Sequence, residues 1–308
     1  MALCQVHYWK PLAGESGSYT LLSRHRGTRR AVVFVHGFNG DAIATWANFQ
    51  TEVDQVNEGL SWWATSDLYF FQYPSVESSI PKSANAFLSF LQRYTPMPSA
   101  SLFQPDRGLT VDFGVSSTDI VPLRTPLDYE ELVLVGHSQG AVVIRQTVLY
   151  ALDVAAADIS KGALPAFHEL LLNAKICLFS PAHRGEHLSG IAGLITEIPL
   201  ASWPFQAALR NFSPSYVQLQ KGSEFLEDLR TRTMKAWYDH GYPALRAYCI
   251  YPDSEQVVND LNFEHDAVPI YETGQTHTSV CKPRSGYVKP LDFVRHADSR
   301  QIAAIQRG

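Results

Sequence analysis

Short uninterrupted apolar runs and longer stretches with helical periodicity alternate along the chain. Residues 31–37 (AVVFVHG) form a β-branched run that predicts a strand buried on both faces. Residues 41–56 (DAIATWANFQTEVDQV) follow with a helical pattern. Residues 67–74 (DLYFFQYP) then predict a second strand, and residues 83–94 (SANAFLSFLQRY) predict a second helix. Strand and helix therefore alternate from the first buried run onward.

The same alternation returns in the second half of the chain. Apolar runs at 131–136 (ELVLVG), 174–180 (AKICLFS) and 245–251 (LRAYCIY) predict buried strands, and the spacing between them leaves room for crossover helices. Residues 4–9 and 19–25 predict two more strands near the start. This order predicts an α/β protein with a mainly parallel central sheet and helices on both faces.

Two segments depart from this alternation. Residues 96–126 are rich in proline, glycine and serine, which predicts a long loop or an insertion. Residues 185–244 are longer than a crossover requires and more apolar than one surface helix requires. They predict either ordinary helices packed on the sheet or a helical cap that shelters an apolar substrate. We expect a single domain over residues 1–308, with residues 185–244 as the cap insertion.

Composition narrows the class of protein. Of 308 residues, 45% are hydrophobic and 18% are charged, which predicts a globular chain with a sizeable core. The net charge of -5 argues against nucleic acid as the main partner. The cysteines lie far apart, which favours free thiols in a reducing compartment. Without a signal-peptide pattern or a bilayer-length apolar run, we expect a cytoplasmic protein.

A serine flanked by glycines is the main candidate for chemistry. Ser138 lies in LVLVGHSQGAVVI, between a predicted strand and a second apolar run. A serine at a sharp strand-to-helix turn needs small residues two positions before and after it, and Gly136 and Gly140 meet that need. The turn places the hydroxyl at a helix N-terminus, where developing negative charge is favoured. The pattern predicts that Ser138 is a nucleophile rather than a serine in an ordinary turn.

A nucleophilic serine also needs donors for the oxyanion, and the loop after the first buried strand supplies one of them. We predict the backbone N–H groups of Phe38 and Gln139 as the donors. Gly37 lets the chain turn tightly beside the serine. His36 either orients this loop through a hydrogen bond or is a structural histidine.

The general base of such a site follows an acid that follows the nucleophile in chain order. The histidines beyond Ser138 are His168, His183, His187, His240, His265, His277 and His296. We select His277 because it follows the last clear strand and lies among small polar residues in ETGQTHTSVCKP. The loop after residues 245–251 offers the acids Asp253, Glu255 and Asp260.

These motifs resemble the α/β-hydrolase superfamily of serine hydrolases, and within it the lipase-like branch that contains the GPI inositol-deacylases and the SERAC-type proteins. The resemblance spans most of the chain and rests on VVFVHGFNGDAIATW, VGHSQGA, FSPAHRG and HTSVCKP. It implies an α/β-hydrolase fold and a base at His277. It also favours Glu255 as the acid, with Asp253 as the alternative. The family has an aspartate before two valines where this chain has PDSEQVVND, and Gly-Thr-Pro-His-Arg-Gly where this chain has SPAHRG.

The predicted activity is hydrolysis of a carboxylic ester by a lipase-like or esterase-like mechanism through an acyl-enzyme, without a cofactor. The expected partner is a small-molecule or lipid ester with an apolar acyl group. The aromatic and aliphatic residues of 185–244 would also serve peripheral membrane contact, which stays open as an alternative to an inward-facing cap.

Two other functions compete with this interpretation. Residues 183–187 (HRGEH) match the H-x-x-E-H pattern in which two histidines, here His183 and His187, bind zinc from one helix. That chemistry requires a helix, whereas Pro181 and Gly185 predict a tight turn, so we expect no metal site. A non-catalytic binding module with the same fold is the second alternative.

Overall fold

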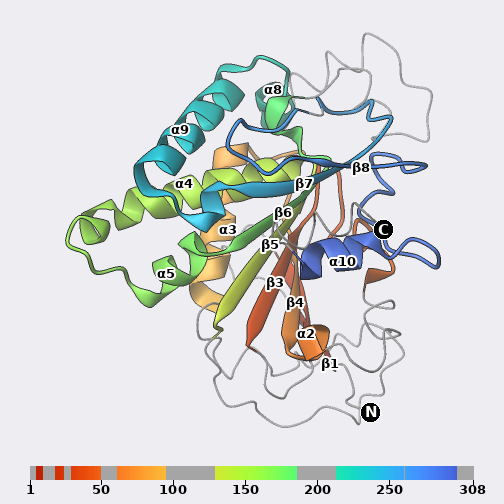
Figure 1. Ribbon diagram of the computed structural model, residues 1–308, viewed down its shortest axis with the longest axis horizontal. Coiled ribbons are helices and arrows are strands. Elements are labelled where there is room, and N and C mark those ends of the chain that lie inside the picture. Colours follow the sequence, from red (N-terminus) through yellow and green to blue (C-terminus); the bar gives the residue numbers. More distant parts are fainter. Residues whose placement is uncertain are drawn as a thin grey trace.

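A central β-sheet organises the molecule (Figure 1). The computed structural model describes residues 5–9, 18–23, 29–49, 61–94, 129–185, 213–259 and 261–296. The sheet has eight strands in the spatial order β1-β2-β4-β3-β5-β6-β7-β8. The strands are β1 (Gln5–Trp9), β2 (Ser18–Ser23), β3 (Arg30–Val35), β4 (Ser66–Gln72), β5 (Glu131–His137), β6 (Lys175–Phe179), β7 (Ala247–Pro252) and β8 (Ile270–Glu272).

Strand direction identifies the fold. Strand β2 runs antiparallel to both of its neighbours, β1 and β4. The strands from β4 to β8 in the sheet are all parallel to one another. This order and these directions are those of the α/β-hydrolase fold. The predictions of a mainly parallel sheet and of this fold are therefore confirmed.

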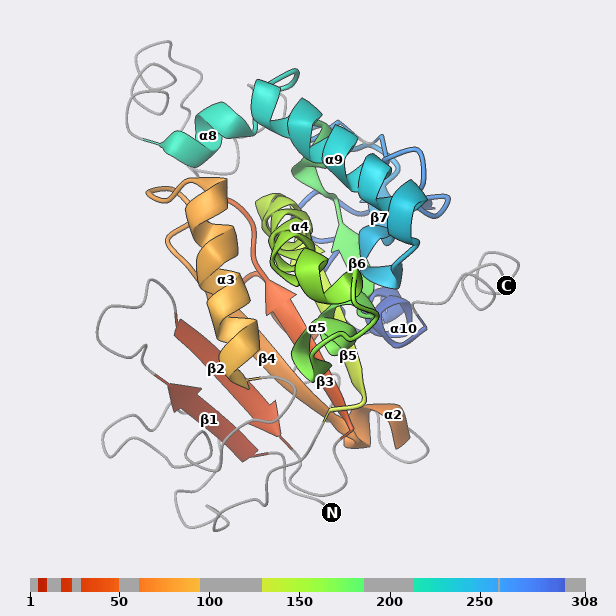
Figure 2. The ribbon, with the colours of Figure 1, turned by 90° about the vertical axis from the view of Figure 1, so that its left-hand side faces the viewer.

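Helices cover both faces of the sheet, as predicted (Figures 1 and 2). On one face lie α3 (Ile80–Tyr94), α4 (Gln139–Ile159), α5 (Ala166–Leu172) and α9 (Glu224–His240). On the other face lie α2 (Ser61–Ala64) and α10 (Lys289–Arg295). The remaining elements are the short helix α8 (Pro214–Gln218) and the 3-10 turns η3 (Ala182–Arg184) and η4 (Pro243–Leu245).

The sheet divides the core into two layers. Successive side chains of a strand point to opposite faces. In β3, Val33 and Val35 accordingly join the core beneath α4, whereas Val32 and Phe34 join the core on the α10 side. Because both faces are covered, the strand reads as an unbroken apolar run rather than an alternating one.

Helix α4 is the central helix and begins directly after Ser138. Among the described helices it alone is long and apolar enough to cross a membrane by length and composition, but 72% of the apolar window is buried inside the fold. It lies against α3, α5 and α9 (Figure 2). Its apolar surface is therefore explained mainly by packing inside the fold.

Some elements differ from the sequence prediction. Residues 42–48 form successive turns rather than the start of the helix predicted over 41–56, and residues 50–60 lie outside the described part of the chain. The predicted loop over 96–126 also lies outside it. Strand β8 and helices α5 and α10 were not predicted, because runs of three and seven residues are too short to show a period.

The 185–244 segment is described only in part. Residues 186–212 lie outside the described part of the chain. Of the rest, α9 packs on α4 and buries Leu226, Leu229 and Ala236 in the core. The single domain over 1–308 and the cap function of the segment stay predictions.

Three cysteines are buried inside the described fold with free thiols. They are Cys177 in β6, Cys249 in β7 and Cys281 in the loop after β8. Burial raises the pKa of each thiol, that of Cys281 to about 12. Thiolate formation is therefore suppressed in the folded state.

Candidate active site

Ser138 occupies the junction between β5 and α4 with a strained backbone. Its φ of 52° and ψ of -119° fall outside the regions that L-residues favour. Its N–H donates to the carbonyl of Phe179 (3.0 Å), and its carbonyl accepts from the N–H groups of Ala141 (3.1 Å) and Ala182 (3.2 Å). The neighbouring strand and the first turn of α4 thus hold the serine in this conformation.

The flanking glycines are required by space. A Cβ at Gly140 would overlap the carbonyl oxygen of Val35, and one at Gly136 would lie 2.9 Å from the backbone of α4. A Cβ at Gly37 would lie 2.9 Å from the Cβ of Ser138. The loop after β3 therefore lies directly against the serine, as its predicted role demands.

Two backbone donors meet at this contact. In the described part of the chain, no acceptor takes the N–H of Phe38 or of Gln139. Gln139 is the first residue of α4, and its side chain is anchored by a hydrogen bond from Nε2 to the carbonyl of Ser75 (3.0 Å). Both amides are thus available to a negatively charged oxygen beside Ser138.

His36 ties the donor loop to the end of β4. Its Nε2 accepts from the N–H of Tyr73 (3.3 Å), so Nδ1 carries the proton and donates to the carbonyl of Gly37 (2.8 Å). The Tyr73 hydroxyl donates to the His36 carbonyl (2.9 Å), and the two rings stack at 4.4 Å. Burial lowers the pKa of His36 to about 4, so the ring is neutral at pH 7. These contacts are the ones that a loop-orienting histidine requires.

His277 and Glu255 form a buried pair. The Nδ1 of His277 lies 3.1 Å from both carboxylate oxygens of Glu255. The N–H groups of Val257 (2.8 Å) and Val258 (3.3 Å) donate to the same carboxylate. Burial raises the pKa of Glu255, but the hydrogen bond and charge of His277 outweigh burial and lower that pKa to about 2. The carboxylate is therefore ionised across the neutral range.

The structure distinguishes the acids of this loop by position. Glu255 reaches His277, whereas the side chain of Asp253 is exposed. The Asp253 N–H donates to the carbonyl of Glu272 (3.1 Å), and its side chain has no hydrogen bond to another described residue. Asp260 lies outside the described residues. The geometry therefore favours Glu255 over Asp253.

The outer nitrogen of His277 and the hydroxyl of Ser138 are both unengaged. Neither His277 Nε2 nor Ser138 Oγ has a hydrogen-bond partner among the described residues, although both atoms are buried. Buried polar atoms normally have partners, so two open ones in one site point to a function that uses them.

His137 links these two groups, and no sequence motif marks it as a site residue. Its Nε2 donates to the backbone carbonyl of His277 (2.8 Å), and the two rings lie 4.9 Å apart. Burial lowers the pKa of His137 to about 3, so the ring stays neutral. Because His137 directly precedes Ser138, this bond holds the base loop against the serine. The G-x-S-x-G pattern leaves this position unspecified, so no local signal marks it.

A buried charged network supports the acid loop from below. Arg145 of α4 donates from Nε to Nδ1 of His183 (3.2 Å) and pairs with the carboxylate of Asp266 (2.5 Å). The Arg145 and Asp266 side chains are only 2% and 0% exposed. Asp266 also accepts from the N–H of Ala247 (2.8 Å) at the start of β7. The network thus joins α4, the turn after β6 and the loop that carries Glu255.

This network also accounts for the first histidine of HRGEH. His183 accepts at Nδ1 from Arg145 and donates from Nε2 to the carbonyl of Leu261 (3.1 Å), so neither ring nitrogen is open to a metal. Residues 182–184 form the 3-10 turn η3, which ends at Gly185, rather than an α-helix. Glu186 and His187 lie outside the described residues. Across the described ranges, no cluster of three or more His, Cys, Asp or Glu side chains could hold a metal ion.

Comparison with known proteins finds solved structures that this chain resembles. No family model and no curated protein matches the chain. The lipase BlEst2 of Bacillus licheniformis is 13% identical (TM-score 0.45), covering 93% of this chain and 96% of that one. Est1E of Butyrivibrio proteoclasticus is 12% identical (TM-score 0.46; 98% and 99% covered), and an inhibited esterase B of Lactobacillus rhamnosis is 11% identical (TM-score 0.48; 98% and 90%). These identities are too low to carry a function across.

Proposed function

We propose that the chain is a serine hydrolase that cleaves carboxylic esters. The observation that carries the proposal is the His277–Glu255 pair, in which the carboxylate holds Nδ1 and leaves Nε2 open. The strained Ser138 with its open hydroxyl and the two free amides beside it supply the other parts of an acyl-transfer site.

In the acylation step, the Ser138 hydroxyl attacks the ester carbonyl while Nε2 of His277 takes its proton. Glu255 accepts the Nδ1–H, which fixes the tautomer of the ring and stabilises the imidazolium that forms. The N–H groups of Phe38 and Gln139 donate to the oxyanion of the tetrahedral intermediate. His277 then gives the proton to the leaving alcohol, and the acyl group stays on Ser138.

In the deacylation step, the same histidine takes a proton from water, which attacks the acyl-enzyme. The tetrahedral intermediate collapses, Ser138 recovers its proton from His277, and the carboxylic acid leaves. Each proton is carried by a residue of this chain.

We propose an apolar acyl group as the substrate preference, with residues 185–244 as its cap. Support comes from α8, in the middle of the segment: the ring of Tyr216 lies 6.4 Å from that of Phe38. Ser215 donates to the carbonyl of Ser75 (2.7 Å), the same carbonyl that receives the Gln139 side chain. Helix α8 thus lies beside Phe38 and shares a backbone acceptor with Gln139. We include lipid esters among the proposed substrates and contact with a membrane surface as a further role of this segment. The resemblance of HTSVCKP to the GPI inositol-deacylase and SERAC branch is likewise a proposal.

Labelling with a fluorophosphonate probe, followed by mass mapping of the adduct, tests the proposal. The wild-type protein is expected to carry the adduct on Ser138. Ser138→Ala is expected to lose it and keep its fold, since the removed hydroxyl has no partner among the described residues. Ser83→Ala is the matched control, because Ser83 of α3 is also buried and its hydroxyl has no partner among the described residues. A folded wild type without an adduct, or an adduct on another residue, would overturn the proposal.

A further inference from the structure

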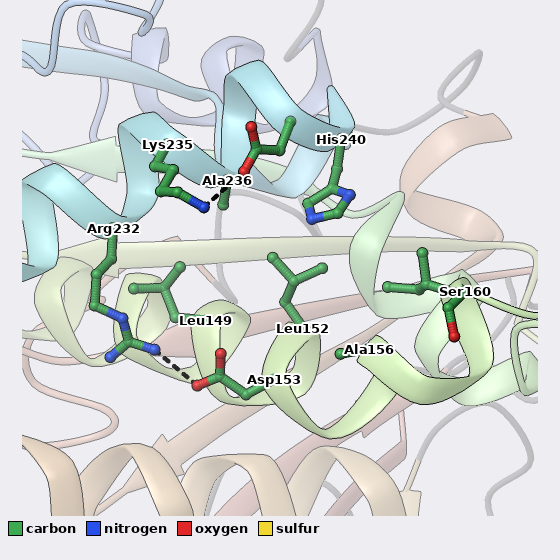
Figure 3. Close-up of a pocket in the computed structure, with 11 residues that line it drawn as sticks. Leu149, Leu152, Asp153, Ala156, Ser160, Arg232, Lys235, Ala236 and His240 are labelled. Atoms are coloured by element: carbon green, nitrogen blue, oxygen red, sulfur yellow. Dashed lines mark hydrogen bonds and ion pairs between the residues drawn. The ribbon is translucent and has the colours of Figure 1, made fainter.

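Two cavities lie away from Ser138, and the charges around them differ. The first measures about 390 Å³ and lies between α4 and α9 (Figure 3). Its acidic and basic side chains are matched in pairs: Arg232 bonds to Asp153 (2.7 Å), and Lys235 bonds to Asp239 (3.0 Å). Its floor is formed by apolar side chains of α4. With its cations already neutralised, this cavity does not call for an ionic ligand.

The second cavity measures about 340 Å³ and lies at the amino-terminal ends of β6 and β7. It is lined by Asn173, Lys175, Trp237, Gly241, Pro243, Arg246 and Tyr248. Since β5, β6 and β7 are parallel and Ser138 follows the carboxyl end of β5, this cavity lies at the opposite end of the sheet from the serine. It is therefore separate from the candidate active site.

The second cavity has an unbalanced positive charge. Ile176 pairs with Ala247, so Lys175, the first residue of β6, and Arg246, the residue just before β7, lie at the amino-terminal ends of neighbouring strands. The Lys175 ammonium bonds to Glu131 (2.8 Å), but that carboxylate also binds Arg30 (2.6 Å).

Arg246 has no counter-ion among the described residues. It forms no ion pair with any described carboxylate, and its buried Nε has no acceptor among the described residues. A guanidinium presents a planar fork of donors that fits a carboxylate or a phosphate. An unsatisfied buried donor of this kind favours an anionic acceptor from outside the chain.

Aromatic walls lie beside this cation. Trp237 and Tyr248 both line the cavity and are half-buried. The ring of Trp237 stacks against that of His265, with centroids 5.9 Å apart and planes 19° apart, which fixes its orientation. Flat apolar walls beside a fixed cation suit a ligand with a planar body and one charged end, and the volume is in the range of small-molecule sites.

We propose that this cavity binds a small aromatic anion, with its carboxylate or phosphate on Arg246 and its ring against Trp237 and Tyr248. The proposal does not depend on the ester hydrolase proposed above. It predicts that charge and ring are both required of the ligand, because the two halves of the cavity recognise different chemistry.

Isothermal titration of the full chain with phenyl phosphate, inorganic phosphate and phenol at constant ionic strength tests this site. Phenyl phosphate is expected to bind more tightly than either of the other probes. Arg246→Gln is expected to weaken its binding at least tenfold, and Trp237→Leu to weaken it severalfold. Arg232→Gln is the matched control: it removes a guanidinium from the first cavity and is expected to leave the affinity unchanged.

Several outcomes would overturn the proposal, and a second variant keeps it testable if the first does not fold. Absence of phenyl phosphate binding to the wild type, or equal affinity of Arg246→Gln and the wild type, overturns it. Equal loss in Arg246→Gln and Arg232→Gln shows a general charge effect and also overturns it. Inorganic phosphate binding as tightly as phenyl phosphate overturns the aromatic half. Arg246→Lys keeps the charge without the fork; if Arg246→Gln does not fold, a weakened affinity in this second variant supports the site and an unchanged one overturns it.

Discussion

Two buried histidines of this molecule look alike in sequence and differ in what they can do. His277 is 5% exposed and His183 is 1% exposed, and each has a charged residue at its Nδ1. In His277 the other nitrogen is open, whereas in His183 it donates to the carbonyl of Leu261. Burial beside a charge is thus not enough to make a base, because a base also needs a nitrogen that is free to accept a proton.

The charge of the partner separates the two histidines further. The neighbour of His277 is the carboxylate of Glu255, which stabilises a positive ring. The neighbour of His183 is the guanidinium of Arg145, and burial together with this cation holds the pKa of His183 well below its usual range. In the proposed mechanism the His277 ring becomes an imidazolium, whereas the His183 ring stays neutral and structural.

Replacing each histidine by alanine is expected to give the largest effects and tests whether the two histidines have different roles. His277→Ala is expected to lower kcat for an acyl ester by about 10⁴–10⁶, as removal of a catalytic base does in comparable sites. His183→Ala is expected to act on stability, because it leaves the buried Nε of Arg145 without its acceptor. Steady-state kinetics and urea unfolding of both variants separate the effects. An active His277→Ala, with more than a tenth of wild-type kcat, would contradict the assigned base.

Changing the acid sharpens the assignment. Glu255→Gln keeps the shape but places an amide opposite Nδ1, which disfavours the required tautomer, so kcat is expected to fall about 10³–10⁴-fold. Asp253→Asn, an equivalent change on an exposed neighbour, is expected to stay near wild type. Equal rates for the two variants would show that the acid lies elsewhere.

The structural side of the comparison is tested at Arg145. Arg145→Met leaves the buried carboxylate of Asp266 without its counter-ion and is expected to destabilise the fold by about 3–5 kcal/mol in urea unfolding. Adding Asp266→Asn, which removes the charge but keeps an acceptor oxygen, is expected to recover part of the loss.

Arg232→Gln is the control for the buried pair. It breaks the ion pair between Arg232 and Asp153, whose side chains are 37% and 59% exposed, respectively. The free energy of unfolding is expected to fall by less than about 1 kcal/mol. Similar costs for Arg145→Met and Arg232→Gln would refute a structural role for the buried network.

Acid tests the buried neutral histidines through their effect on stability. Burial lowers the pKa of His36 to about 4, of His137 to about 3 and of His183 well below 6.5. The unfolded chain therefore binds more protons below pH 6.5, and stability falls with decreasing pH by up to about 1.4 kcal/mol per pH unit for each histidine. Glu255, with a folded pKa of about 2 instead of 4.5, adds a further loss between those two values.

Urea unfolding from pH 7.5 to 5 measures this slope. His36→Asn is expected to flatten it by about one proton, since one neutral histidine is removed. A wild-type protein whose stability does not change between pH 6.5 and 5 would contradict the buried neutral histidines.

The pattern of neighbouring residues in the sequence predicted the strands and the serine turn, because these features depend on nearby residues. Apolar runs predicted the parallel strands because each strand is buried on both faces. Gly136 and Gly140 marked Ser138 because the turn has no room for a Cβ. The loop offered both Glu255 and Asp253, and only their different burial in the folded chain separates them.

Long-range contacts were beyond prediction for a physical reason. His137 bonds to a carbonyl 140 residues away, and Arg145 bonds to a carboxylate 121 residues away. Neither partner has a periodic or spaced pattern that marks it, because the sheet brings them together only after the crossovers have formed. The two groups that hold the base and acid loops in place therefore became visible only in the folded chain.

The three buried thiols can report when different parts of the fold open. Cys177 and Cys249 lie in neighbouring central strands, whereas Cys281 follows His277 by four residues and lies 3.4 Å from the carbonyl of Thr45. An alkylating reagent reaches such thiols only when the structure around them opens. Residue-resolved alkylation rates would therefore time the opening of the base loop separately from that of the sheet, without any added label site.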